Sequence, residues 1–298
     1  MLWYIPVILK VLTAHVLFPW VSKHVGMKHS IQKRNFLNFS FCALVALLWA
    51  IWRGQLVFNE TTLFIFGVGI ANGLAAYCQW KAISINLSRN SLFTFFDDVI
   101  AVSLSCMILH ESRFINLLSG TGIAASFLAV VFFAIRDYRK KTETGNSLIP
   151  ASFYFYVGFY SVVWGVATFL MKLWGVQHIS VSTFVCFWYA GAWVGSLSIF
   201  VYVKRYHHQI NPPFVRRDFG YVGIMGSMMM IALALGYMAY ERAPQTIVQP
   251  IFLVSEMVLP ALIGLWIFNE RKGFRMADWF LIGLAIAGGA LVAVSYGN

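Results

Sequence analysis

The strongest constraint on the fold of this chain is a series of ten apolar runs, each close to the length of a membrane-spanning helix. An α-helix crosses the hydrocarbon core with about 20 mostly apolar residues. In lipid every backbone polar group must be bonded within the structure, and a helix meets this requirement by itself. Only 11% of the residues are charged, against roughly 25% in soluble domains. We therefore predict an all-α integral membrane protein.

The apolar runs and the breaks between them define the expected transmembrane helices. The first run lacks a basic start and a small-residue cleavage site, so we expect a helix that stays and not a signal peptide. The four cysteines lie within apolar runs without metal-ligand spacing, and we expect neither a metal nor a cofactor. The predicted spans are 3–22, 36–53, 62–85, 90–109, 115–135, 152–174, 180–203, 219–240, 245–267 and 276–295.

A polar segment in the middle of the chain, "RDYRKKTETGNSLIP" at 136–150, divides the spans into two groups of five. It predicts a first five-helix repeat over 1–135, a cytoplasmic linker over 136–150 and a second repeat over 151–298. Because each group has an odd number of helices, the second must enter the membrane in the opposite sense. Such 5+5 inverted repeats hold substrate near the midplane, between the two halves.

Two acids support the relation between the halves. When Glu111 is aligned with Glu270, the residues 14 positions earlier are Asp97 and Glu256, both in the middle of a span. The alignment makes Asp97 and Glu256 equivalent residues on mirror-related helices.

The basic residues predict the orientation in the membrane. Connections after the odd-numbered spans carry sixteen lysines and arginines, and those after the even-numbered spans carry three. Basic residues are retained in cytoplasmic loops. We therefore expect a multi-pass protein of the cell (inner) membrane with both termini outside the cytoplasm. The net charge of +11 then reflects these loops, and we expect no nucleic-acid partner.

Asp97 and Asp98 stand in an otherwise apolar run. A charged side chain at the bilayer centre costs about 2.5–3.5 kcal/mol on insertion scales, so such residues usually face a cavity or a partner. Neighbouring helical residues point about 100° apart. We expect Asp97 to face a central cavity with Glu256, and Asp98 to meet a neighbouring helix, with Lys10 as a candidate partner. The alternative is that these acids make only structural contacts between helices.

Lys10 and His15 lie in the first span, five residues apart. On an α-helix this spacing points them about 140° apart, so we expect that one ligand does not touch both. Lys10 could pair with an acid, bind a substrate carboxylate or extend to the interface. His15 could relay protons or form a buried structural hydrogen bond.

Aromatic side chains in the spans could line a binding cavity, because aromatic walls bind flat or cationic ligands. The chain has 11 Trp, 13 Tyr and 27 Phe, so most must face lipid or the interface. The candidates are Tyr77, Gln79 and Trp80 on the third span, Tyr160 and Trp164 on the sixth, and Tyr237 and Tyr240 on the eighth.

Lys172, Glu111 and Arg113 are among the charged residues that lie near the ends of spans. We expect Lys172 to extend to the interface, although it follows a Trp-Gly pair that gives it some weight as a binding residue. Glu111 stands beside Arg113, and we expect this pair to fix a helix end at the interface.

Several segments resemble the drug/metabolite transporter superfamily in its ten-helix EamA-type form. They are "WGVATFLMK" (164–172), "MAYERAPQTIVQPIFLVSEMVLPALIGLWIFNER" (238–271), "WKAISINLSRNSLFTFFDDVIAVSLSCMILHES" (80–112) and "LIGLAIAGGALVAV" (281–294). The resemblance implies a permease for small metabolites such as amino acids, amines, nucleotide-sugars or cationic drugs. Members of this form usually have cytoplasmic termini, which is the opposite of the orientation that the charges predict here.

We expect a secondary transporter that moves a small metabolite, such as an amino acid, an amine or a cationic drug-like compound, by alternating access. Coupling to protons through Asp97 and Glu256 and uncoupled exchange both stay open. The rivals are a passive channel or facilitator and an intramembrane enzyme with an Asp97/Glu256 dyad. No P-loop, HExxH or G-x-S-x-G motif is present, so we expect neither ATP drive nor enzyme activity. Expected partners are the substrate, the lipid bilayer and protons, with the chain a monomer or a weak homodimer.

Overall fold

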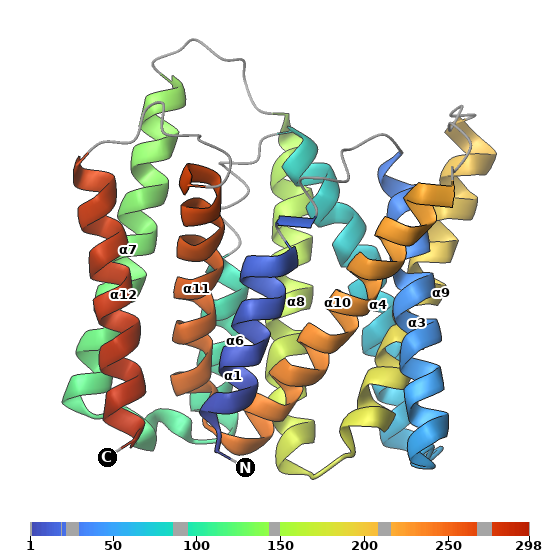
Figure 1. Ribbon diagram of the computed structural model, residues 1–298, viewed down its shortest axis with the longest axis horizontal. Coiled ribbons are helices and arrows are strands. Elements are labelled where there is room, and N and C mark those ends of the chain that lie inside the picture. Colours follow the sequence, from blue (N-terminus) through green and yellow to red (C-terminus); the bar gives the residue numbers. More distant parts are fainter. Residues whose placement is uncertain are drawn as a thin grey trace.

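The computed structural model describes residues 2–18, 20–21, 30–85, 95–142, 150–207, 216–266 and 276–297. Within these ranges the chain is helical apart from short connections and contains no strand, which confirms the all-α prediction (Figure 1). The elements are α1 (Tyr4–Lys10), the π-helix η1 (Val11–Leu17), α3 (Ile31–Arg53), α4 (Glu60–Ile85), α6 (Phe95–Ile108), the 3₁₀ helix η2 (Glu111–Phe114), α7 (Leu117–Thr142), α8 (Ala151–Val176), α9 (Val181–His207), α10 (Arg216–Arg242), α11 (Gln245–Trp266) and α12 (Met276–Gly297).

The lengths and surfaces of these helices fit a membrane-embedded protein. Among the described residues, α3, α4, α8, α9 and α10 are long and apolar enough to cross a membrane. The outer surfaces of the helices are apolar as well. Trp52, Phe58 and Leu117 are each at least 80% exposed, and many other large apolar side chains are exposed along the helices. Apolar surface of this extent would be a liability in water and is expected against lipid.

Both termini lie at the same end of the bundle, which we call the terminal end (Figure 1). The connections at 54–59, 109–116, 177–180 and 243–244 lie there too. Hydrogen bonds join these connections to neighbouring helix ends. Ser182 donates to the side chain of Gln55 over 2.8 Å, and Asn116 donates to the carbonyl of Ser295 over 3.5 Å.

The helix contacts link the two halves of the chain. They pair α4 with α9, α3 with α10, α8 with α4 and α6, α1 with α10, η1 with α11, α3 with α9, α6 with α11, and α7 with α12. Most of the apolar core lies between α3, α8, α9 and α10, where Phe184 stacks on Tyr237 with ring centroids 4.1 Å apart. A second core joins α7, α11 and α12.

The α4–α9 contact depends on glycines spaced four residues apart on both helices. Gly69 and Gly73 face α9, and Gly191 and Gly195 face α4. A Cβ at Gly69 would overlap the carbonyl oxygen of Trp188. This spacing of small residues is the pattern that lets membrane helices approach closely.

A buried ion pair holds together the helix ends at the terminal end. Lys172 Nζ lies 3.5 Å from Glu111 Oε1 and donates to the carbonyl oxygens of Tyr240 and Ala243 over 2.7 and 2.8 Å. Glu111 Oε2 accepts from the backbone N–H of Thr246 over 3.1 Å. The lysine thus binds the last carbonyls of α10, and the glutamate binds the first N–H groups of α11.

The expectation that Lys172 extends to the interface and that Glu111 acts with Arg113 is wrong, although Glu111 does fix a helix end as predicted. Lys172 and Glu111 are only 6% and 3% exposed, and Glu111 pairs with Lys172 and not with Arg113. The physical reason is the short turn between α10 and α11. It leaves backbone groups of both helix ends inside the protein, where they need charged partners.

The glycine contact makes a prediction with a matched control on the same helix. Gly69→Ala should lower the free energy of unfolding by about 1–3 kcal/mol, because the added methyl forces α4 away from α9. Gly67→Ala should leave stability unchanged or raise it, because a Cβ there meets no atom within 4 Å. Unfolding of both variants in detergent checks this, and equal destabilisation would contradict the packing.

Breaking the ion pair should be more damaging than removing a surface charge. Lys172→Met should cost about 3–5 kcal/mol of stability, because it leaves the Glu111 carboxylate buried without its partner. The double variant Lys172→Met/Glu111→Gln should recover part of this loss. Arg113→Gln, at an exposed neighbour, is the control and should have little effect. Melting temperatures in detergent measure all three, and no difference between Lys172→Met and the control would refute the role of the pair.

Candidate functional site

A cavity of about 430 Å³ lies inside the bundle and is lined by seven helices of the described part of the chain. This volume is in the usual range for small-molecule sites. It is lined by Lys10, Ala14, His15 and Phe18 of the first helix, Ala76, Gln79 and Trp80 of α4, Asp97 and Asp98 of α6, Tyr160, Trp164, Thr168 and Met171 of α8, Tyr189 of α9, Met228, Met229, Ala232, Leu233, Gly236 and Tyr240 of α10, and Gln249, Phe252 and Glu256 of α11.

The acidic residues of the cavity lie about halfway along the bundle. The backbone of Asp97 packs against Gly165, near the middle of α8, where a Cβ would come within 2.7 Å of the Asp97 carbonyl oxygen. Glu256 lies near the middle of α11. Because Gly165 has no side chain, α6 can pack closely against α8 at the position of Asp97.

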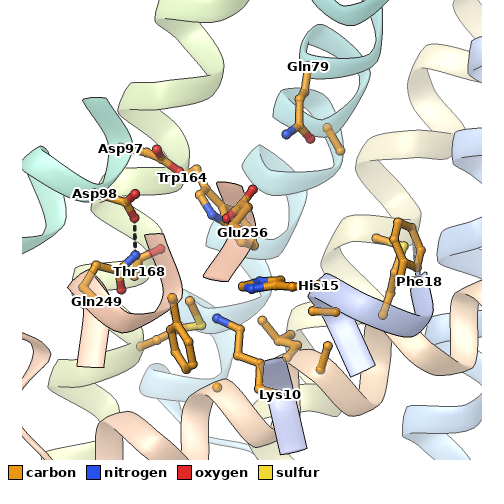
Figure 2. Close-up of a pocket in the computed structure, with 18 of the residues that line it drawn as sticks. Lys10, His15, Phe18, Gln79, Asp97, Asp98, Trp164, Thr168, Gln249 and Glu256 are labelled. Atoms are coloured by element: carbon orange, nitrogen blue, oxygen red, sulfur yellow. Dashed lines mark hydrogen bonds between the residues drawn. The ribbon is translucent and has the colours of Figure 1, made fainter. Parts of the chain in front are cut away.

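Asp97 and Asp98 both line the cavity (Figure 2). Asp98 is also a candidate binding residue in the sequence, but the expectation that two adjacent acids cannot face the same place is wrong. Asp98 does meet a neighbouring helix: its Oδ1 accepts a hydrogen bond from Gln249 Nε2 on α11. Gln249 Oε1 in turn accepts from the hydroxyl of Tyr240 on α10. A chain of hydrogen bonds from Tyr240 through Gln249 thus fixes the Asp98 carboxylate at the wall of the cavity.

Glu256 is the third acid of the cavity, and it comes from α11, which packs directly against α6. Its side chain is exposed within the cavity, whereas Asp97 is buried at its wall. Coulomb interactions couple Glu256, Asp97 and Asp98 with one another and with Lys10. Three acids face one lysine, so negative charge exceeds positive charge when all are ionised.

Lys10 and His15 line the same cavity, whereas α-helical spacing predicts that they point about 140° apart. The reason is the local helix type. Residues Val11–Leu17 form a π-helix, in which hydrogen bonds join residues five apart. Five residues then make about one turn, and the two side chains share a face. π-helical turns are often found at functional sites.

The ammonium of Lys10 lies over an aromatic ring. Its Nζ is 3.4 Å from the ring centroid of Phe252 and 5.9 Å from that of Tyr240. The distal part of the side chain runs along Gly236, where a Cβ would be 3.3 Å from Lys10 Cδ. This geometry is a cation–π interaction.

His15 is tied to the helix that carries Glu256. Its Nδ1 lies 2.7 Å from Ser255 Oγ, and the Ser255 hydroxyl donates to the carbonyl of Phe252 over 2.9 Å. Which of the two atoms donates depends on the tautomer of the imidazole. His15 thus joins the first helix to α11 beside the cavity.

The aromatic candidates divide into two groups. Trp80, Tyr160, Trp164 and Tyr240 line the cavity, and Tyr160 and Trp164 are nearly parallel with centroids 6.4 Å apart. The guanidinium of Arg34 lies 3.9 Å from the ring centroid of Trp80.

Tyr77 and Tyr237 do not belong to the cavity lining. Tyr77 lies next to Lys81, whose Nζ is 5.7 Å from the Tyr77 ring centroid. Tyr237 is fully buried against Phe184, and its hydroxyl donates to the carbonyl of Ile179 over 2.9 Å. The helical rotation between Tyr237 and Tyr240 directs the first toward α9 and the second toward the cavity.

Sequence reasoning missed Gln249 and Phe252. Both lie on the face of α11 that carries Glu256, at distances of seven and four residues. Residues at these spacings share one face of a helix. The position of Glu256 could therefore have identified them, once it was taken as a cavity residue.

The comparisons with known proteins bear on the fold alone. No family model matches this chain, and no curated protein matches it. One solved structure, described only as "Crystal structure of protein", is similar over 99% of this chain and 97% of its own length, with a TM-score of 0.69 and 14% sequence identity. At this identity the likeness shows that the whole chain adopts a fold already observed in another protein, and it shows nothing about function.

Proposed function

We propose that this protein is a secondary transporter that binds a small organic cation in the central cavity and moves it by alternating access. The observation that carries the proposal is the meeting of Asp97, Asp98 and Glu256 at one cavity about halfway along the bundle. Ionisable residues inside a membrane protein are expensive and mark substrate or ion pathways. The rivals, a passive channel or an intramembrane dyad enzyme, find no separate support in the geometry.

The proposed architecture is ten transmembrane helices in a 5+5 inverted repeat, as in EamA-type members of the drug/metabolite transporter superfamily. In this repeat each helix of the first half has an equivalent helix in the second half. The equivalent helices are α1 and α8, α3 and α9, α4 and α10, α6 and α11, and α7 and α12. The contact of α4 with α9 then corresponds to that of α10 with α3, and the contact of α8 with α4 corresponds to that of α1 with α10. Acids on the mirror helices α6 and α11 facing one cavity fit substrate binding between the halves.

The charge and walls of the cavity favour a cation among the expected substrates. Three acids outnumber one lysine, and the aromatic faces of Trp164, Tyr240 and Phe252 attract positive charge. A free carboxylate would be repelled by both features. Amines and quaternary ammonium ions are therefore the proposed substrates, ahead of amino acids.

Proton coupling follows from the same carboxylates. A carboxylate inside the membrane can bind a proton or an organic cation, and the two compete for one site. Inward movement of protons would then drive outward movement of the substrate. Asp97 and Glu256 are the proposed carriers, because both line the cavity and occupy equivalent positions in the two proposed repeats.

Transport in proteoliposomes tests the proposal. The protein should catalyse exchange of radiolabelled tetraethylammonium or another quaternary ammonium ion across the membrane. Asp97→Asn and Glu256→Gln should each reduce the rate at least about tenfold, because each removes a negative charge that attracts the cation, and charge pairs a few ångströms apart outside bulk water are worth about 4 kcal/mol. Glu60→Gln changes an exposed acid outside the cavity and should leave the rate unchanged.

Unchanged exchange in both cavity variants would refute the role of the acids. Exchange of amino acids but of no organic cation would refute the proposed substrate class. A channel would conduct the ion without accelerating exchange against an unlabelled gradient, so counterflow separates it from a carrier.

We also propose that the terminal end faces away from the cytoplasm of a cell with the protein in its inner membrane. Arg53, Arg113 and Arg242 are near the terminal end, whereas Lys33, Arg34, Lys204 and Arg205 are near the opposite end. In a variant whose native cysteines are replaced, Arg113→Cys should react with a membrane-impermeant thiol reagent added to intact cells. Lys204→Cys should react only after permeabilisation. The reverse pattern would place both termini in the cytoplasm.

A further inference from the structure

Among the described residues that line the cavity, Lys10 is the only lysine or arginine, and it lies in an unusual position among three acids. Its ammonium lies on the face of Phe252, 3.4 Å from the ring centroid, with Tyr240 as a second aromatic neighbour. A free alkylammonium ion entering the cavity would favour the same place, because aromatic faces and nearby carboxylates both attract it.

No directional bond holds the Lys10 ammonium. In the described part of the chain, Nζ makes neither an ion pair within 4 Å nor a hydrogen bond. A permanent buried counter-ion would be expected to donate to a carboxylate, as Lys172 does to backbone and glutamate oxygens. Lys10 is held instead by the ring face and by the field of Asp97, Asp98 and Glu256. A free ammonium could replace it without leaving a broken hydrogen bond behind.

The space around Lys10 has the shape of an alkylammonium chain. Gly236 leaves room on α10, and a Cβ there would be 3.3, 3.4 and 3.5 Å from Cδ, Cε and Nζ of the lysine. The lysine side chain is itself a butylammonium group on a flexible stem. Lys10 is the last residue of α1, directly before the π-helix, and its side chain ends on the ring of Phe252.

We propose that Lys10 is a tethered surrogate for the substrate: its ammonium occupies the cation position of the empty cavity, and the ammonium of the substrate displaces it. This inference rests on the proposed transport of organic cations. In this role Lys10 determines the affinity of the cavity for organic cations and its specificity among them. This role also gives a reason why an empty cavity with three acids can exist inside a membrane.

The surrogate has a consequence for the transport cycle. With Lys10 on Phe252, the empty protein has part of its negative charge compensated and can reorient without substrate. When substrate binds, the lysine moves off the ring toward one of the carboxylates that attract it. The affinity of the protein for its substrate is lower than that of the same cavity without Lys10, because every substrate ion must displace the lysine.

Binding of n-butylammonium, which copies the lysine side chain, is the direct test. Lys10→Met removes the surrogate and should tighten binding at least about tenfold, because one positive charge a few ångströms from the ligand is lost. Lys10→Gln should have the same effect, and it replaces Lys10→Met in the experiment if the methionine variant does not fold. Lys10→Arg keeps the charge and should stay within about threefold of the unmodified protein. Calorimetry on purified protein in detergent measures each affinity.

A second substitution tests whether ligand and lysine use the same ring face. Phe252→Leu should weaken n-butylammonium binding about fivefold or more in the Lys10→Met background, where only the ligand uses the ring. In the unmodified protein the same change should have a much smaller effect, because it also weakens the competing lysine. This coupling between residues 10 and 252 would not arise from a structural lysine.

The inference is overturned if Lys10→Met and Lys10→Gln bind n-butylammonium no more tightly than the unmodified protein. It is also overturned if Phe252→Leu has the same effect in both backgrounds. Either result leaves the proposed transport standing, provided that the unmodified protein exchanges organic cations in proteoliposomes. If no organic cation binds to any of these proteins, the proposed function fails and the surrogate fails with it.

Discussion

The cost of keeping carboxylates away from water is the constraint on which the rest of this structure depends. Three acids of α6 and α11 face one cavity inside a bundle whose outer surface is apolar. Each would be costly against lipid. The structure reduces this cost with an amide donor to Asp98 and one ammonium in the same cavity. The same cost makes the site attractive to a cation from outside.

The supporting architecture brings these groups together by close contacts between backbones. Gly165 lets α6 approach α8 so that Asp97 reaches the cavity wall, and the glycines of α4 and α9 lock the two halves at one crossing. The buried pair of Lys172 and Glu111 closes the turn between α10 and α11 and so fixes Tyr240 and Gln249 on either side of that turn.

The sequence predicts the helices well, because apolar runs of span length can fold in lipid only in a few ways. It also pairs Asp97 with Glu256 through their equal distances from Glu111 and Glu270, and the structure places both side chains at one cavity.

The relation between Lys10 and His15 could not be predicted from the sequence. Their relation depends on a π-helix, for which an apolar run carries no distinct periodicity. Tyr77 and Tyr237 illustrate a second limit: in a helix that is apolar all round, no pattern tells which side faces the cavity. Lys172 and Glu111 illustrate a third, because their burial follows from backbone groups that lack partners at a turn between two helices.

The most direct test of the central claim is an experimental structure of the protein with a heavy-atom-labelled organic cation, such as 4-bromobenzylammonium. The account predicts an anomalous bromine signal inside the cavity, with the ammonium near Phe252 and the carboxylates of Asp97, Asp98 and Glu256. Lys10 should then have moved off the ring. A cavity that stays empty at saturating ligand, or a cation found only on the lipid-facing surface, would contradict the claim that these acids form a cation-binding site.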